Sequence, residues 1–318
     1  MIKKASELTN ATTKIRILIA GYPGVGKSTT ALSAPRPLII DTDRGIMRVS
    51  AKHRVDGIPN RIGVIQPSTY EELLDDLNGN DLSEYETIIF DTGMSLFNLM
   101  KYHVIKTDAK NGKRDGSLSL QGYGAIGREF QSLMDMAYYK LNKNVVVIFH
   151  AKEEKDGDST RLRILIEGQT KDTIWQSMDI GGFIEMEGNE RVIQFQNCER
   201  FFAKRTYGIK SKYVLNDLSG NTENKFLTNL FEEVQNNIKT EQAEIQDQRY
   251  KYEELMAKYD FSDPEVDINE LLEQIAKEDH VLTSAAELKA KLIKKAKDGG
   301  YVYDKRQQKY ILNNAKSA

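Results

Sequence analysis

The chain has 318 residues, of which 40% are hydrophobic and 29% charged, and its formal net charge is −2. This length allows one sizeable hydrophobic core and an appended segment. One cysteine, Cys198, excludes an internal disulfide and any cysteine-rich metal site. No run approaches the roughly 18 apolar residues of a membrane span, and the first residues lack the apolar stretch of a signal peptide. We therefore expect a cytoplasmic protein without a membrane partner.

The small net charge hides an asymmetry near the C-terminus. Residues 239–279 carry 13 acidic and 5 basic side chains, whereas residues 287–309 carry 8 basic and 3 acidic ones. The overall charge therefore neither favours nor excludes nucleic-acid binding, and only local patches of charge can indicate it.

The first predicted element is a buried strand at residues 15–20 (IRILIA), which a glycine-rich loop and a helix-forming stretch follow. The loop matches G-x-x-x-x-G-K-[ST] at every fixed position. In such a strand–loop–helix unit, consecutive backbone N–H groups converge on an anion. The residues expected to bind ATP are Gly21, Tyr22, Pro23, Gly24, Val25, Gly26, Lys27, Ser28 and Thr29.

Two side chains of this loop have defined chemistry. Lys27 is expected to reach the β- and γ-phosphates, and the Ser28 hydroxyl is expected to ligate Mg²⁺. The alternative is a glycine-rich turn with a surface lysine, which the preceding strand disfavours. The sequence therefore predicts a site for a nucleoside triphosphate and Mg²⁺.

Further strand-like runs lie at 37–41 (PLIID), 62–66 (IGVIQ), 87–91 (TIIFD) and 145–150 (VVVIFH), with helical patterns at 70–77 and 126–141. Continuously apolar strands alternating with helices predict an α/β fold with a mainly parallel sheet flanked by helices. Asp91, at the end of one run, is expected to hold Mg²⁺, usually through a water. An aspartate that caps a strand is the alternative for this weak pattern.

The later strand-like runs, at 161–167, 182–186, 191–196 and 212–215, are shorter and separated by Gly and Asn turns, which predicts an antiparallel extension. Three helices (225–258, 268–277, 284–297) and a hairpin (301–303 with 309–312) follow. The expected domains are an N-terminal extension (1–13), a P-loop ATPase domain (14–217) and a helical C-terminal extension with a basic tail (218–318).

The elements Asp41-Thr42-Asp43-Arg44-Gly45 and Ala203-Lys204-Arg205-Thr206, together with the phosphate loop, resemble the RecA-like recombinase ATPases. The resemblance covers residues 14–215 and implies a RecA-like core. It also implies that Asp43 activates the attacking water, with Asp in place of the family's Glu. The arm is one methylene shorter, so geometry and rate are expected to differ. An acidic turn residue is the alternative.

Other roles follow from the same resemblance. His150 stands where the family has an amide that senses the γ-phosphate, and a histidine that caps the strand is the alternative. Lys204 and Arg205 match a basic element that reaches a neighbour's nucleotide, which implies a homo-oligomer, either ring or filament. A solvated basic turn is the other interpretation.

Two segments, 107–124 and 152–163, correspond to the family's DNA-binding loops. Lys110, Lys113 and Arg114 are expected to contact phosphates of single-stranded DNA, and Tyr123 is expected to stack on a base. Ordinary mobile loops are the alternative. In its combination of the phosphate loop, residues 41–45 and residues 203–206, the chain looks most like the phage-encoded minimal RecA-core ATPases associated with single-strand annealing. These lack the recombinase N-terminal domain, and the roughly 13 residues before the first strand agree with that lack. The resemblance does not extend to the last hundred or so residues.

The C-terminal tail combines a basic helix with a hairpin that carries Tyr301, Tyr303 and Tyr310. It either grips single-stranded DNA or forms a solvated face with tyrosines packed inward. A single-strand-binding protein is a further expected partner of this region.

The sequence thus predicts a phage- or mobile-element-encoded ATPase that acts on single-stranded DNA in recombination, annealing or repair. The alternative function is a nucleotide-dependent switch or assembly ATPase that has a protein partner and does not bind DNA.

Overall fold

A computed structural model describes residues 13–53, 62–156, 159–166, 170–217, 222–259, 261–262 and 267–312. Two compact units are present, one formed by residues 12–237 and one whose described residues begin at Ile238. All of the expected N-terminal extension except Thr13 lies outside the described residues, as do 157–158, 218–221 and 313–318. The expected boundary between 217 and 218 stays a prediction, and the compact units divide between Asn237 and Ile238.

The first unit is built on a nine-stranded sheet in the described residues, with the order β3-β2-β4-β5-β1-β7-β8-β9 and β6 paired with β5. The strands from β3 to β7 in this order run parallel, and β8 and β9 are antiparallel. Their bounds are β1 (Arg16–Gly21), β2 (Pro37–Asp41), β3 (Gly63–Ile65), β4 (Thr87–Asp91), β5 (Asn144–Asp156), β6 (Ser159–Ile164), β7 (Ile180–Glu187), β8 (Glu190–Gln194) and β9 (Lys212–Leu215).

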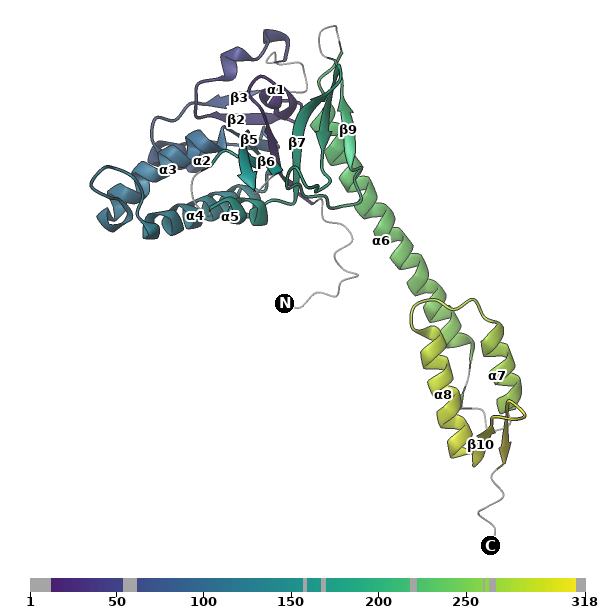
Figure 1. Ribbon diagram of the computed structural model, residues 1–318. Coiled ribbons are helices and arrows are strands. Elements are labelled where there is room, and N and C mark those ends of the chain that lie inside the picture. Colours follow the sequence, from purple (N-terminus) through teal and green to yellow (C-terminus); the bar gives the residue numbers. More distant parts are fainter. Residues whose placement is uncertain are drawn as a thin grey trace. The chain divides into compact units, whose positions relative to one another are not determined.

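Helices cover one face of this sheet, as Figure 1 shows: α2 (Tyr70–Gly79), α3 (Gly93–Thr107), α4 (Leu120–Asp135) and α5 (Thr170–Ser177). Side chains alternate between the two faces of a strand. Leu18, Ile40 and Phe90 therefore join the core beneath these helices, where Phe130 and Leu96 are fully buried. The expected α/β class with a mainly parallel, helix-flanked sheet is confirmed.

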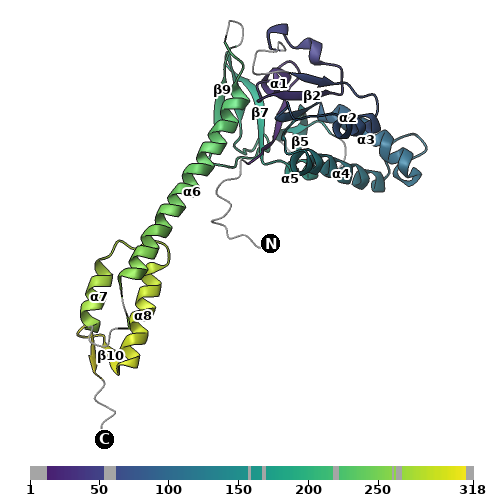
Figure 2. The ribbon, with the colours of Figure 1, turned by 180° about the vertical axis from the view of Figure 1, so that it is seen from behind.

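Helix α6 (Phe226–Lys258) begins beside β9, which Figure 2 shows from behind. The ring of Phe226 contacts Tyr213 at 5.7 Å between centroids, and Leu227 and Val234 are fully buried. The backbone N–H of Leu227 donates to Ser33 Oγ at 2.8 Å. The first turns of α6 are thus part of the core of the first unit.

Three sequence expectations need correction. Strand β7 is parallel to β1, which differs from the expected antiparallel extension, whereas β6, β8 and β9 form antiparallel pairs as expected. The segment 152–163 is a β-hairpin whose described residues continue β5 and form β6, with Glu153 opposite Leu162. The segment 107–124 is a loop only up to Ser119, which caps α4 by accepting from Gly122 N. Strand β5 continues past its apolar run into this hairpin through charged residues, which give no strand signal in the sequence.

The second unit contains the rest of α6, α7 (Ile268–Lys277), α8 (Ser284–Asp298) and the hairpin of β10 (Tyr301–Asp304) and β11 (Lys309–Leu312). Leu271, Ile275, Leu288 and Leu292 form its small core. Tyr301 and Tyr310 pack against that core, whereas Tyr303 is 44% exposed. The hairpin therefore follows the inward-packed alternative for two of its three tyrosines.

Across the described ranges, no helix combines the length and apolarity needed to cross a lipid bilayer.

Asp41 is a buried anchor of the turn that follows β2. It is fully buried and accepts hydrogen bonds from Gly45 N (2.7 Å), Ile46 N (3.3 Å) and Gln66 Nε2 (2.7 Å). Asp41→Ala leaves these donors unpaired, so we expect a loss of about 2–4 kcal/mol of unfolding free energy. Urea unfolding followed by Trp175 fluorescence measures it. The exposed Asp75→Ala on α2 is the matched control, expected within about 0.5 kcal/mol of wild type. Equal midpoints for Asp41→Ala and wild type would contradict the anchor role.

Candidate functional site

The phosphate loop joins the end of β1 to α1 (Lys27–Ala31) at the carboxyl edge of the parallel strands. Gly24 and Gly26 have φ angles of +79° and +89°, the left-handed region that glycine enters without strain. Such a turn aims successive backbone N–H groups into one concavity, which suits an anion. The sequence motif therefore has the backbone conformation that its chemistry requires.

Lys27 is held at the loop in a largely buried position. Its side chain is 5% exposed, and Nζ donates to the backbone oxygen of Tyr22 at 2.7 Å. Burial lowers the pKa of Lys27 to about 8, and the negative charge of Asp91 opposes that shift. An ammonium group deprived of water interacts more strongly with phosphate oxygens than a solvated one.

Asp91 ends β4 next to Ser28. Burial raises the pKa of Asp91 to about 6, a hydrogen bond from Ser28 opposes that, and the charges of Asp43 and Asp41 raise it further. A hydroxyl and a carboxylate are hard oxygen ligands of the kind Mg²⁺ takes. In the described residues no group of three or more His, Cys, Asp or Glu could hold a metal. One carboxylate and one hydroxyl still fit Mg²⁺, because it keeps waters and shares phosphate oxygens.

Asp43 lies in the turn after β2, within electrostatic range of both Asp91 and His150. Its Oδ2 accepts from Arg48 Nη1 at 3.1 Å. The Asp43 side chain is 25% exposed, so solvent reaches it. A role as acceptor of a water proton would require Arg48 to share or release this carboxylate.

His150 sits beside the loop because it pairs with Gly21 in the β1–β5 register. Its Nδ1 is buried and has no hydrogen-bond partner in the described structure. Burial lowers the pKa of His150, as do Lys27 and Arg48, whereas Asp43 raises it. The His150 ring thus lies within electrostatic range of both Lys27 and Asp43, with one ring nitrogen that has no partner in the described structure.

The structure does not bring Lys204 or Arg205 to this loop. The backbone of Lys204 pairs with Gly181, whose neighbour on β1 is Leu18, three residues before Gly21. Lys204 Nζ donates to the Met178 oxygen, further toward the amino end of the strands. Arg205 is exposed. Neither cation contacts a nucleotide in the loop of its own chain.

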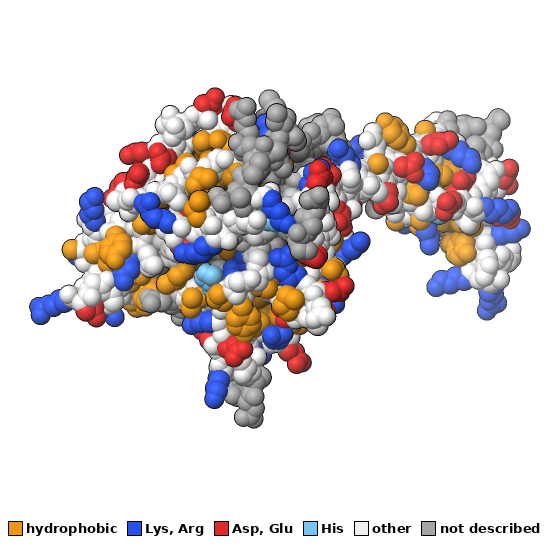
Figure 3. Space-filling model, turned by 90° about the horizontal axis from the view of Figure 1, so that it is seen from above, with side chains coloured by type: hydrophobic (Ala, Val, Ile, Leu, Met, Phe, Trp, Pro, Cys, Tyr) orange, Lys and Arg blue, Asp and Glu red, His pale blue; other side chains and the backbone are white. Residues whose placement is uncertain are grey.

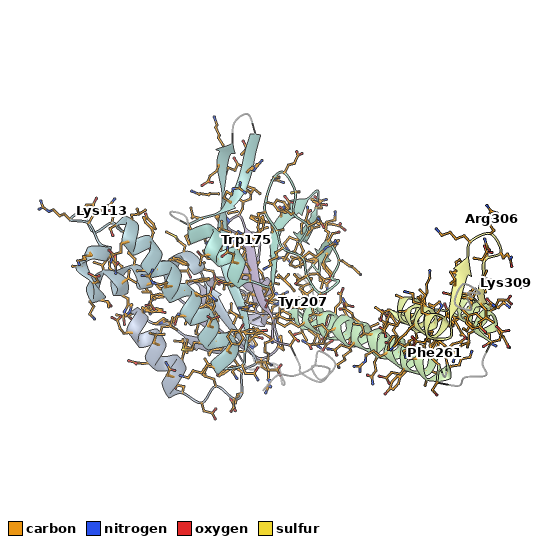
Figure 4. All side chains as sticks on the ribbon, turned by 90° about the horizontal axis from the view of Figure 1, so that it is seen from below. Lys113, Trp175, Tyr207, Phe261, Arg306 and Lys309 are labelled. Carbon is orange, nitrogen blue, oxygen red and sulfur yellow. The ribbon has the colours of Figure 1, made fainter. Side chains whose placement is uncertain are left out.

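The predicted DNA-contacting side chains lie at the far end of α3. This helix spans 15 residues, about 22 Å, and leads away from Asp91. Lys110, Lys113 and Arg114 are exposed beyond it, and Lys113 projects outward in Figure 4. Tyr123 instead lies in the first turn of α4 and packs against the core. Tyr123 was expected on a loop, which is wrong because Ser119 starts a helix there.

Sequence reasoning missed Arg191 on β8. Its guanidinium lies against Gly26, where an added Cβ would overlap it, and Nη2 donates to the Asn216 oxygen at 3.1 Å. Arg191 and Thr29 line a cleft of about 730 Å³ beside the loop. No pattern around Arg191 signals this place, because β8 is brought next to the loop only by its pairing with β7.

The loop also contacts the hairpin of β5 and β6. Tyr22 Oη donates to Glu153 Oε1 at 2.7 Å. Glu153 is the register partner of Leu162 on β6. The only available sequence signal was a tyrosine at a variable position of the motif, which carries no information about its partner.

Surface charge alone does not locate a nucleic-acid site. On the face shown in Figure 3, basic, acidic and hydrophobic side chains are interspersed among the coloured residues. Local geometry therefore has to identify any such site.

Comparison with known proteins shows the family of the chain. A family model described as an AAA domain matches residues 13–207, more than half of the chain. No curated protein matches the chain. Among solved structures, a chain described as an ATPase domain is similar over 58% of this chain and 77% of that chain, with 9% identity and a TM-score of 0.34.

Glycine at position 26 is required by its left-handed φ, and an added Cβ would in addition displace the flexible end of the Arg191 side chain. We expect Gly26→Ala to weaken ATP binding at least tenfold, roughly the effect of 1–2 kcal/mol of backbone strain plus the clash. Titration with a fluorescent ATP analogue and Mg²⁺ measures this. Gly24→Ala has the same strain but nothing within 4 Å of its Cβ, so its smaller loss isolates the strain.

Further variants complete that series. Arg191→Ala alone measures what the guanidinium contributes to ATP affinity, and its combination with Gly26→Ala should cost less than the sum of the two single losses, because the overlap is gone. Gly79→Ala, whose Cβ meets open space, should bind as wild type. Wild-type affinity in Gly26→Ala would overturn the requirement.

Proposed function

The chain belongs to the AAA domain family, and on that premise we propose that it binds ATP with Mg²⁺, hydrolyses it, and acts on single-stranded DNA in recombination, annealing or repair. The observation that carries the ATPase proposal is the convergence of Lys27, Asp91, Asp43 and His150 at one edge of the sheet. The P-loop ATPase domain itself follows from the family. The roles of single residues below are part of the proposal.

In this proposal the loop amides around Gly24 and Gly26 and the ammonium of Lys27 bind the phosphates. Lys27 exchanges its bond to the Tyr22 oxygen for phosphate oxygens. Ser28 and Asp91 would hold Mg²⁺, which supplies charge neutralisation of the phosphates when bound. Asp91 has to be ionised for this, and binding of a dication favours that form despite its burial.

Asp43 accepts the proton of the water that attacks the γ-phosphate. The carboxylate would do so after loosening its contact with Arg48, which lies on the same turn. His150 donates a hydrogen bond toward the γ-phosphate from its neutral ring. His150 is positioned by strand β5, and Asp43 is positioned by the turn that Asp41 anchors, so neither depends on a mobile loop.

The nucleoside has room in the cleft beside Thr29. Its volume of about 730 Å³ falls in the range of ligand pockets. Arg191, on the wall nearest Gly26, offers a cation to the α-phosphate or the face of the base. The triphosphate then runs from this cleft toward Asp91 and Asp43.

The remaining parts of the proposal concern partners. Exposed Lys110, Lys113 and Arg114 would contact single-stranded DNA, and the Tyr22–Glu153 hydrogen bond supports communication between the hairpin and the phosphate loop. Lys204 or Arg205 would act on the nucleotide of a neighbouring subunit in a homo-oligomer. A phage or mobile-element origin and a single-strand-binding protein partner for the C-terminal region complete the proposal.

Lys27 and Asp43 have separable roles. We expect Lys27→Ala to abolish hydrolysis and to weaken ATP binding by about a hundredfold or more, because a desolvated charge on the phosphates is lost. Asp43→Asn should bind ATP within about threefold of wild type but lose roughly 10²–10⁴ in turnover. Nucleotide titration and phosphate release measure the two effects, with Asp75→Asn as the exposed control. Normal turnover in Asp43→Asn would show that another group activates the water.

DNA dependence separates the proposal from an ATPase that serves only a protein partner. Single-stranded DNA should stimulate phosphate release, and its affinity should fall steeply with salt. Replacing Lys110, Lys113 and Arg114 together by Ala should reduce the slope of log affinity against log salt by about two, since each phosphate contact contributes roughly 0.7. An unchanged ATPase rate with no DNA binding at low salt would favour the protein-partner function.

A further inference from the structure

A second cavity lies in the first unit, apart from the phosphate loop, where α5 meets the β5–β6 hairpin and the segment after β8. Its volume is about 520 Å³, and Trp175, Phe202, Arg163 and Lys204 are among its lining residues. Trp175 and Phe202 meet edge to face, with centroids 4.9 Å apart and planes at 74°. Of its lining residues, only Lys204 has a role in the proposed function, on the nucleotide of a neighbouring subunit, and no residue of the chain's own phosphate loop lines the cavity.

The indole of Trp175 is fixed by its surroundings. It is partly buried, and its six-membered ring lies so close to Gly181 that a Cβ at that position would overlap it. The backbone of Gly181 exchanges two hydrogen bonds of 2.9 Å with Lys204. Figure 4 shows Trp175 between the helical layer and the strands. Such a ring has lost its conformational freedom before any ligand arrives, so little entropy remains to be lost on stacking.

Phe202 is outward-facing because its neighbours are inward-facing. Phe201 is 2% exposed and stacks on Phe183 at 4.8 Å, and Ala203 is 4% exposed, whereas Phe202 is 42% exposed. In an extended segment, alternate side chains point to opposite sides. The core thus positions a large aromatic ring at the mouth of the cavity.

The charges around the cavity have one sign. Arg163 and Lys204 line it, and no acidic side chain is among its described lining residues. Lys204 keeps its carbonyl partner Met178, and Arg163 is half-buried on β6. Aromatic faces beside cations, with no carboxylate, suit a planar ring that is attached to an anion.

We propose that the Trp175–Phe202 cavity is a stacking site for one base of single-stranded DNA, with Arg163 on the adjacent phosphate. This rests on the proposed action on single-stranded DNA and places base contact here, in place of the expected contact at Tyr123. A duplex hides its base faces, so the site selects unpaired strands.

The cavity is also connected to the ATPase site. Leu162 in its wall is the register partner of Glu153, which accepts the hydrogen bond of Tyr22. In addition, Leu162 N donates to the backbone oxygen of Arg200, next to the segment that carries Phe202. A base that moves this wall therefore acts on the phosphate loop through the Leu162–Glu153 pair and the hydrogen bond from Tyr22 to Glu153.

The single tryptophan of the chain makes the test direct, because all indole fluorescence comes from Trp175. Titration of the full chain with an oligodeoxythymidylate should quench this fluorescence as the oligonucleotide binds, with binding followed in parallel by anisotropy of a labelled strand. Phe202→Ala should weaken binding about tenfold, the effect typical of one stacked base. Tyr102→Ala, an exposed aromatic on α3, is the matched control and should bind as wild type. Arg163→Gln should reduce the salt dependence of binding by about one phosphate contact.

Each other outcome rejects the assignment in a different way. Binding by anisotropy without a change in Trp175 fluorescence, and with wild-type affinity in Phe202→Ala, would reject this cavity but leave action on DNA intact. No DNA binding at all would reject the proposed DNA function as well. Equal quenching by ATP and Mg²⁺ without DNA, or by raising the protein concentration alone, would assign the cavity to nucleotide or to a second copy of the chain.

Discussion

The buried pair of Lys27 and Asp91 is the constraint on which the site depends. Each charge is largely removed from water, and each shifts the pKa of the other toward the ionised form. The pair is incompletely satisfied by itself, since Lys27 turns to the Tyr22 carbonyl and Asp91 to the Ser28 hydroxyl. A ligand that brings phosphate oxygens to Lys27 and a divalent cation to Asp91 relieves both costs of burial at once. The unfavourable burial of these two charges is therefore what a metal-bound polyphosphate would offset.

Parallel strands explain why these groups meet. In a parallel sheet the carboxyl ends of all strands lie on one edge, and ligands bind there. Gly21 and Asp91 end β1 and β4, and His150 lies opposite Gly21 on β5, which runs between these two strands, although the three residues are far apart in the chain. The turn after β2 adds Asp43, and the fully buried Asp41 holds that turn by three hydrogen bonds. Asp41, to which the sequence assigns no chemistry, thus positions Asp43.

The hairpin of β5 and β6 contacts both the phosphate loop and the proposed base-binding cavity. It contacts the phosphate loop through Tyr22 and Glu153, and it forms a wall of the Trp175–Phe202 cavity through Leu162. A single element thereby lies between the ATPase site and the proposed base-binding site. Coupling between hydrolysis and an unpaired strand then needs no large rearrangement, because the hairpin touches both.

Local pattern in the sequence determined the elements whose residues are apolar and contiguous: β2, β4 and β9 and helix α7 have the expected bounds, and the phosphate loop has the expected conformation. Asp91 and Lys27 were found because each ends or follows such a run. Tertiary structure alone decided that β7 is parallel, that Arg191 lies on Gly26, and that Trp175 and Phe202 share a cavity. The physical reason is that the former depend on neighbours in the chain, whereas the latter depend on strand pairing between residues remote in sequence, for which side-chain periodicity carries no signal.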